Sequence, residues 1–162
     1  MTTTLSTGVK APEFSLLDQN GQLHQLRDYV GRLLLLYFYP KDDTPGCTTE
    51  ACGLRDAWSE LTELGVAVLG ISADSVQSHA KFADKFKLPF PLLADTDKTM
   101  LQAYGVLAEK SMFGKKFIGI KRMSFLIDSE GKIAKIYPAV KPASHASEVL
   151  ADAQTLLNHE AL

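Results

Sequence analysis

The chain contains two cysteines, and both fall in one short stretch, YPKDDTPGCTTEAC, at residues 39–52. Cys47 follows Thr-Pro-Gly, and Cys52 lies five residues further on. Two thiols are too few for the disulfide framework of a small secreted protein, and with no histidine nearby in sequence they cannot complete a zinc site. Two closely spaced thiols therefore indicate redox chemistry, with two inert buried cysteines as the alternative.

The residues before Cys47 are typical of a helix start. Thr44 suits the N-cap, Pro45 the first helical position, and Cys47 then stands third. A thiol there faces unpaired backbone N–H groups and the partial positive charge of the helix N-terminus, which favour the thiolate. Because the thiolate is the nucleophilic form, Cys47 is predicted to be the attacking group.

Three other functions of this stretch do not fit the residues that it contains. A thioredoxin-type dithiol has the pattern Cys-x-x-Cys, but Thr44 occupies the position of its first cysteine. A phosphate-binding loop needs more glycines and a Lys-Ser/Thr pair. A thiol protease needs a partnered histidine. The histidines lack such a signature and are predicted to be solvated or structural: His24, His79, His145 and His159.

The elements that must position Cys47 alternate between strands and helices. Apolar runs predict strands at residues 12–17, 33–39, 66–71, 121–127 and 132–137. Apolar residues at intervals of three and four, together with capping residues, predict helices at residues 44–64, 74–86, 99–104 and 144–158. The order predicts an α/β protein with a thioredoxin-like fold: a central mixed sheet flanked by helices, with an N-terminal β-hairpin extension.

Two local predictions accompany this layout. Asp74, with Gln77 three residues later, is expected to cap the second helix. A basic cluster interspersed with glycines is expected to be a solvated loop, with a role in guiding a reductase or an anionic substrate as the alternative; it comprises Lys115, Lys116, Lys121 and Arg122.

Length and composition predict one globular domain over residues 1–162. The apolar fraction is 46%, the charged fraction is 22%, and the net charge of −2 gives no reason to expect nucleic acid or an anionic membrane as a partner. No apolar run approaches the roughly 18 residues that span a bilayer. The first residues lack the basic and hydrophobic regions of a signal peptide, which favours the cytoplasm.

The stretch around Cys47 resembles the active-site motif of the peroxiredoxins, Pro40-x-x-x-Thr44-x-x-Cys47. The wider segment GCTTEACGLRD resembles the bacterioferritin comigratory protein, or PrxQ, branch of that family. The resemblance extends to APEFSLLDQNG near the start, to VLGIS, and to IKRMSFLID at residues 120–128. One motif of three residues is weak, but four matches in register with the predicted fold are specific.

The resemblance implies a role for each of five residues. Cys47 would be the peroxidatic cysteine, and Thr44 would hold the peroxide together with the Cys47 backbone N–H. Pro40 would shield the sulfur from water. Arg122 would stabilise both the thiolate and the leaving oxygen, unless it is only a surface salt-bridge residue. Glu50 would orient the arginine, although a carboxylate in a first helical turn is also ordinary capping.

The resemblance also implies that the oxidised Cys47 must be resolved by a thiol, and Cys52 is the only candidate in the chain. On an intact helix a five-residue step separates the Cα atoms by roughly 8–9 Å, whereas a disulfide needs about 4.4–6.8 Å. We therefore expect the helix to unwind from residue 44 to about residue 54 on oxidation. A one-cysteine mechanism with an external thiol is the alternative.

The expected activity is reduction of hydrogen peroxide and small alkyl hydroperoxides, without metal, haem or flavin. The resemblance implies electrons from a dithiol protein such as thioredoxin, and a monomer. Two other readings stay open at this point. One is a thiol–disulfide oxidoreductase acting on protein substrates, and the other is a redox-sensing or chaperone module.

Overall fold

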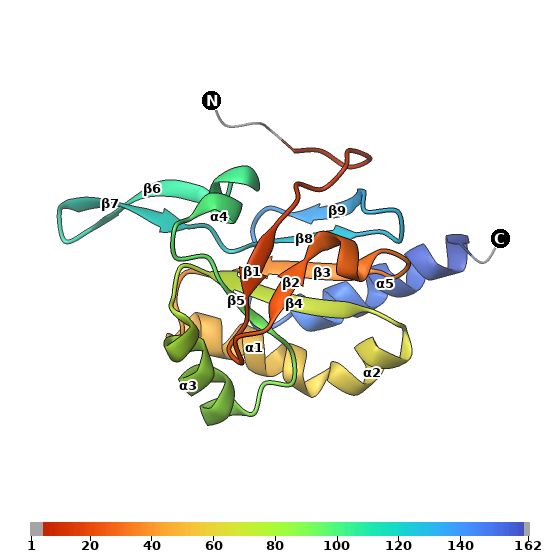
Figure 1. The fold of residues 1–162 in the computed structure, drawn as a ribbon, viewed down its shortest axis with the longest axis horizontal. Helices are drawn as coiled ribbons and strands as arrows, with labels where there is room; N and C mark the ends of the chain where they lie inside the picture. The colour runs from red at the N-terminus through yellow and green to blue at the C-terminus, as the bar shows by residue number, and fades with distance from the viewer. Residues whose placement is uncertain (1–4, 161–162) are drawn as a thin grey trace.

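The computed structural model describes residues 5–160 and is built on a five-stranded mixed sheet (Figure 1). Its strand order is β5-β4-β3-β8-β9. The bounds are Leu34–Phe38 for β3, Ala67–Ser72 for β4, Leu92–Ala94 for β5, Met123–Ile127 for β8 and Ile133–Tyr137 for β9. Strands β3, β4 and β5 are parallel, whereas β8 and β9 run antiparallel to their neighbours. The predicted mixed sheet is confirmed.

Strand β3 lies at the centre of the sheet and is buried on both faces. Leu34, Leu36 and Phe38 pack into one hydrophobic cluster, while Leu35 and Tyr37 pack into a second cluster across the sheet. This follows from the two-residue repeat of a strand, which sends alternate side chains to opposite faces. An uninterrupted apolar run is what a strand covered on both sides requires.

Helices cover both faces of the sheet, as predicted. One face packs against α1 (Pro45–Asp56), α2 (Trp58–Glu63), α3 (Val76–Phe86) and α5 (His145–Glu160). The other packs against α4 (Thr99–Ala103), the 3-10 turn η1 (Leu26–Tyr29), and the antiparallel hairpin of β1 (Ser15–Leu17) and β2 (Leu23–Gln25). Within residues 5–160, no helix combines the length and the hydropathy that a bilayer crossing demands.

Two helix boundaries differ from the prediction. The helix expected over residues 44–64 is divided at Ala57, whose φ of −91° and ψ of 3° separate α1 from α2. The N-cap of α3 is Ser75, whose hydroxyl accepts the backbone N–H of Ser78 at 3.1 Å, so the prediction of Asp74 was wrong. Asp74 instead accepts hydrogen bonds from the backbone N–H of Asp42 and the hydroxyl of Ser72. Because its carboxylate is engaged there, the next residue caps the helix.

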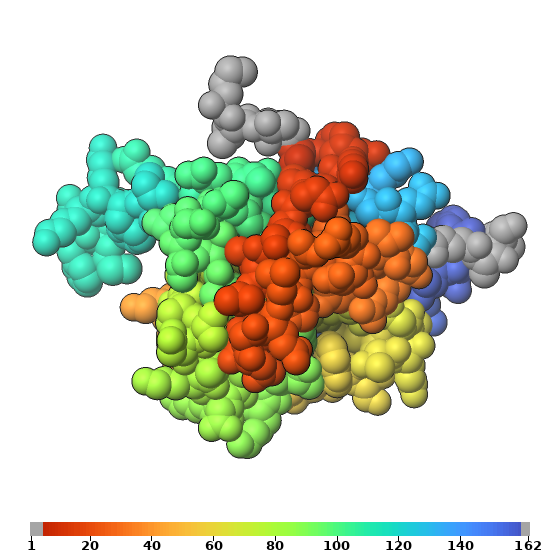
Figure 2. Space-filling model, viewed as in Figure 1, coloured from red at the N-terminus to blue at the C-terminus, as the bar shows by residue number. Residues whose placement is uncertain are grey.

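The basic segment predicted to be a loop forms a β-hairpin. Strands β6 (Leu107–Met112) and β7 (Lys115–Ile120) pair antiparallel around a turn at Phe113 and Gly114. The hairpin projects from the body of the protein (Figures 1 and 2). Phe113, in the turn, is 97% exposed. Its strands pair only with each other, so the sequence has no buried face and no strong period-two signal.

Candidate active site

Cys47 lies at the start of α1, where the chain leaves the carboxyl end of β3. Thr44 is the N-cap in an extended conformation, and Pro45 is the first helical residue. The side chain of Thr44 does not cap the helix, because its hydroxyl donates to the carbonyl of Lys41 at 2.8 Å. Among the described residues, the backbone N–H of Cys47 has no acceptor. The first turn therefore directs a free donor toward the region of the thiol.

The thiol of Cys47 is buried and lies against a guanidinium group. Only 1% of the residue is exposed, and it belongs to the cluster that includes Ala51 and Leu54. Its Sγ lies 3.5 Å from Nη2 of Arg122, which stands between β7 and β8. The carbonyl of Arg122 accepts the backbone N–H of Val140 at 3.1 Å. A positive charge is thus held beside the sulfur from outside the helix.

Glu50 lies one helical turn after Cys47 and contacts the same arginine. Its Oε1 accepts a hydrogen bond from Nη1 of Arg122 at 2.9 Å, and only 1% of Glu50 is exposed. Positions three apart share one face of a helix, so a single guanidinium reaches both groups. Burial acts to lower the pKa of Arg122, but its hydrogen bond to Glu50 and the charge of Cys47 raise that pKa on balance. The arginine is therefore permanently charged.

The carboxyl of Glu50 is not fully satisfied. Among the described residues, its Oε2 has no hydrogen-bond partner. Burial raises the pKa of Glu50 from 4.5 to about 7, while the hydrogen bond and charge of Arg122 act in the opposite direction. A carboxyl of this kind exchanges its proton near neutral pH instead of being fixed as an anion.

Gly46 makes the approach of the arginine possible, a role that sequence reasoning missed. A Cβ added at Gly46 would stand 2.8 Å from Nη2 of Arg122, which is closer than such contacts occur. A glycine in the first turn, beside a reactive cysteine, was the available signal for close approach of a side chain.

Among the described residues, the other predicted site residues make no side-chain hydrogen bond to this trio. Cys47, Glu50 and Arg122 are in direct contact. Thr44 and Pro40 are half-buried in the connection between β3 and α1, and no hydrogen bond in the described residues joins Thr44 to the thiol. Cys52 is half-buried further along α1, and both thiols are free.

Within the described part of the chain, no buried histidine is available to serve the thiol as a base. His79 and His145 are fully buried, and both ring nitrogens of each are engaged with other groups. This matches the prediction that the histidines are structural or solvated. The environment of Cys47 depends instead on the helix start and on Arg122.

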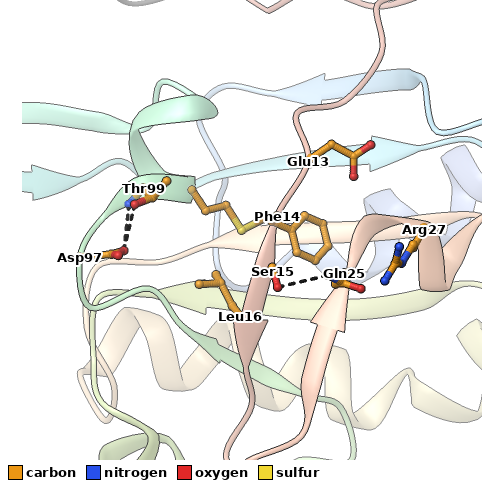
Figure 3. A pocket seen from close by; sticks show the side chains of 9 residues that line it. Glu13, Phe14, Ser15, Leu16, Gln25, Arg27, Asp97 and Thr99 are labelled. Carbon is orange, nitrogen blue, oxygen red and sulfur yellow. Dashed lines mark hydrogen bonds between the residues drawn. The ribbon is translucent and has the colours of Figure 1, made fainter.

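A cavity of about 450 Å³ lies on the other side of the sheet, between the N-terminal hairpin and the start of α4 (Figure 3). Phe14 and Met100 line it and belong to the cluster that does not contain Cys47. Glu13, Arg27 and Asp97 also line it, and no thiol does. The cavity is therefore separate from the site around Cys47.

The sequence is similar to curated peroxiredoxins over nearly its whole length. A profile described as the AhpC/TSA family matches residues 7–136. A putative peroxiredoxin Bcp from Coxiella burnetii is 52% identical over 147 residues, which is 91% of this chain and 97% of the relative. Peroxiredoxin Bcp from Escherichia coli strain K12 is 49% identical over 146 residues, which is 90% of this chain and 94% of the relative.

Solved structures of similar proteins have the same fold. The bacterioferritin comigratory protein of Xanthomonas campestris, studied for its alkyl peroxide reduction, superimposes with a TM-score of 0.86 at 38% identity. The match covers 93% of this chain and 98% of that one. A cysteine-to-serine mutant of PrxQ from Xylella fastidiosa has a TM-score of 0.90 at 34% identity, covering 96% of this chain and 99% of that one.

Proposed function

The chain belongs to the AhpC/TSA family and, within it, to the Bcp or PrxQ peroxiredoxins; it is therefore a thiol-dependent peroxidase, and we propose that Cys47 is its peroxidatic cysteine. The thiolate attacks one oxygen of a hydroperoxide, so that a sulfur–oxygen bond forms and the oxygen–oxygen bond breaks. The sulfur is oxidised by two electrons to a sulfenic acid, and the other oxygen takes a proton and leaves as water or alcohol. The observation that carries this assignment is the 3.5 Å contact between Cys47 Sγ and Arg122 Nη2 at a helix start.

The surrounding groups suit the charge that moves during this reaction. The guanidinium of Arg122 stabilises the thiolate before attack and the leaving oxygen during attack. The free N–H of Cys47 donates to a peroxide oxygen. Thr44 donates its own hydroxyl hydrogen to Lys41, so its oxygen remains able to accept the O–H of the peroxide. Pro40, which is half-buried and has no backbone N–H, is assigned the role of shielding the sulfur from water.

The burial of Cys47 favours a small substrate. A protein disulfide must bring two sulfur atoms and their backbones close to the attacking thiolate, and a residue that is 1% exposed does not admit them. Hydrogen peroxide and small alkyl hydroperoxides need only reach the sulfur with one oxygen. The same burial disfavours a thiol–disulfide oxidoreductase that uses Cys47 as its entry point.

Cys52 is the resolving cysteine in this proposal. Its thiol attacks the Cys47 sulfenic acid, water leaves, and an intramolecular disulfide forms. Because both residues lie on α1, the bond requires that helix to unwind locally. The unwound disulfide is then open to a dithiol protein such as thioredoxin, which returns both sulfurs to thiols. The enzyme acts as a single-domain monomer.

Stopped-flow mixing of the reduced protein with hydrogen peroxide, followed by mass mapping, tests these assignments. Wild-type protein is expected to react in a rapid phase and to yield a Cys47–Cys52 bond. Cys47→Ser should lose the rapid phase. Cys52→Ser, the matched control, should keep it but accumulate sulfenic or sulfinic acid at Cys47. A rapid phase retained in Cys47→Ser would refute the nucleophile, and oxidised wild type without an internal bond would refute Cys52 as the resolving residue.

A further inference from the structure

The carboxylate of Asp42 anchors the 39–44 loop, defined as the residues that join β3 to α1. Oδ1 of Asp42 accepts the hydroxyl of Tyr39 at 2.6 Å. Oδ2 lies 2.7 Å from Nδ1 of His79 and accepts the hydroxyl of Ser78 at 2.8 Å. His79 is fully buried, Tyr39 is 1% exposed and Asp42 is 8% exposed. Both carboxylate oxygens are therefore engaged away from bulk water.

His79 connects this carboxylate to the sheet. Its Nε2 lies 2.9 Å from the carbonyl oxygen of Leu93 in β5, so that nitrogen must carry a hydrogen. Its Nδ1 faces a carboxylate oxygen, so a second proton lies between His79 and Asp42. The imidazole thus donates toward the strand on one side and is bridged by a proton to the loop on the other, which fixes its orientation.

The loop backbone is held by the same region. The N–H of Asp42 donates to Oδ2 of Asp74 at 2.9 Å, and Ser72 donates its hydroxyl to the same oxygen at 2.7 Å. The N–H of Tyr39 donates to the carbonyl of Ile71 at 3.1 Å. All these partners belong to β4, β5, α3 or the turn between β4 and α3, so the anchoring does not depend on α1.

The cluster is better suited to fixing a loop than to binding a metal. Donor atoms of Asp42, Asp74 and His79 lie within 4.8 Å of one another, a spacing that a divalent cation could use. However, both nitrogens of His79 and both oxygens of Asp42 already have protein partners. A cation would have to displace these hydrogen bonds, and the described residues offer no unpartnered buried ligand there.

We propose that Asp42 and His79 are positioning residues for the peroxide reaction, a proposal that rests on the function assigned to Cys47 above. They hold the 39–44 loop in the shape that sets Thr44 and the first turn of α1 against Arg122. The loop contains Asp43 at a φ of 56°, a left-handed conformation that is uncommon for residues with a side chain, although aspartate adopts it more readily than most. The buried network holds the residue that precedes it, Asp42.

The same anchoring keeps the 39–44 loop in place throughout the catalytic cycle. The network lies wholly outside residues 45–56, so it stays formed while α1 unwinds and refolds. Thr44 then keeps its place, and each refolding returns Cys47 to the same geometry. A small displacement of reacting groups costs about 10²-fold in rate, which sets the scale of the expected effect.

Paired substitutions at His79 separate positioning from filling space. His79→Asn keeps an amide near the place of Nδ1 and can still bond Asp42, whereas His79→Gln reaches toward Leu93 and loses Asp42. His79→Gln is expected to lower the second-order rate constant for peroxide by roughly 10- to 100-fold, and His79→Asn by less than about threefold. The rate of internal disulfide formation should change in neither variant. Equal peroxide rates in the two variants would overturn the proposal.

A second pair keeps the test decisive if a His79 variant does not fold. Tyr39→Phe removes the hydroxyl that Asp42 accepts, while Tyr37→Phe removes a buried hydroxyl with no partner in the described residues. The two rings stack in the same cluster, with centroids 5.4 Å apart, so the substitutions are matched. Tyr39→Phe alone should slow the peroxide step, by roughly 3- to 10-fold for one lost hydrogen bond. Equal rates here also overturn the proposal, whereas absence of the rapid phase in wild type would refute the assigned function instead.

Discussion

Two adjacent segments, the 39–44 loop and helix α1, are held in opposite ways. The loop is fixed by directional hydrogen bonds of Asp42, which is buried and is bonded to α3 and to the turn between β4 and α3. Helix α1 is held by apolar packing, by the contacts of Arg122 with Glu50 and Cys47, and by one hydrogen bond from Arg55 to the carbonyl of Phe86. Its N-cap side chain makes no cap bond, and an oxygen of Glu50 is unpartnered in the described residues.

The difference teaches how a fixed site and a moving helix can share one stretch of chain. Buried polar bonds leave costly unpaired groups when broken, so the loop keeps its conformation. Helix α1 has fewer buried hydrogen bonds to the rest of the protein, and glycines at residues 46 and 53 lower the cost of unwinding it. The rigid part thus precedes the cysteine, and the labile part contains it.

The largest expected effect is on hydrogen exchange after oxidation. Residues 45–56 should lose protection by roughly 10³-fold or more, because an unwound segment opens with almost no free-energy cost. The 39–44 loop should keep its protection. Mass-spectrometric exchange on reduced and oxidised protein measures both segments, with Cys47→Ser as the control that cannot form the bond. An oxidised protein with an unchanged α1 would break the comparison.

The next largest effect is expected on the peroxide rate constant when Arg122, which contacts α1 from outside the helix, is replaced. Arg122→Met should lower the rate constant for peroxide by roughly 10²–10³-fold, because it removes the charge that stabilises the thiolate and the leaving oxygen. Arg122→Lys keeps the charge but lacks the planar fork that reaches Cys47 and Glu50 together, so an intermediate rate is expected. Stopped-flow measurement of both variants decides this. A wild-type rate in the methionine variant contradicts the assigned role.

Glu50 should make the stability of the reduced protein depend on pH. Because its pKa is raised from 4.5 to about 7 by burial, the folded state binds this proton more tightly than the unfolded chain. The resulting stabilisation is fully present below pH 4.5 and is lost as the pH rises through 7, at most about 3 kcal/mol. Urea unfolding at pH 5 and pH 8 should show this loss in wild type and a smaller loss in Glu50→Gln. Equal losses in both proteins would contradict it.

The smallest effect on stability is expected from the exposed ion pair that joins the 39–44 loop to α3. Lys85 lies 2.8 Å from Oδ2 of Asp43, but the two side chains are 59% and 46% exposed. Solvent screens such a pair, so Lys85→Ala should change the unfolding free energy by less than about 0.5 kcal/mol. Thermal unfolding of Lys85→Ala and of Tyr39→Phe compares the stability lost at the exposed ion pair with that lost in the buried network. A larger loss in the lysine variant would show that the buried network is not the main anchor.

Much of the fold could be predicted because it depends on local patterns. The apolar run of β3 and the Thr-Pro-Gly start of α1 follow from strand periodicity and from capping, and the structure confirms both elements. The hairpin of β6 and β7 was missed because its strands bury no face and pair only with each other. The prediction that Asp74 caps α3 was wrong because its carboxylate accepts a hydrogen bond from Asp42 in the 39–44 loop, 32 residues away in sequence.

The amino-acid sequence by itself determined the reactive element: a cysteine in the first turn of a helix, five residues before a second thiol on the same helix. These are relations between near neighbours, and backbone geometry converts them directly into structure. Only the tertiary structure decided which distant groups meet that element, since contacts across 75 residues, as between Cys47 and Arg122, depend on how the sheet is assembled. The same holds for Asp42 and His79, whose pairing is set by the packing of α3 against the loop and not by any local pattern.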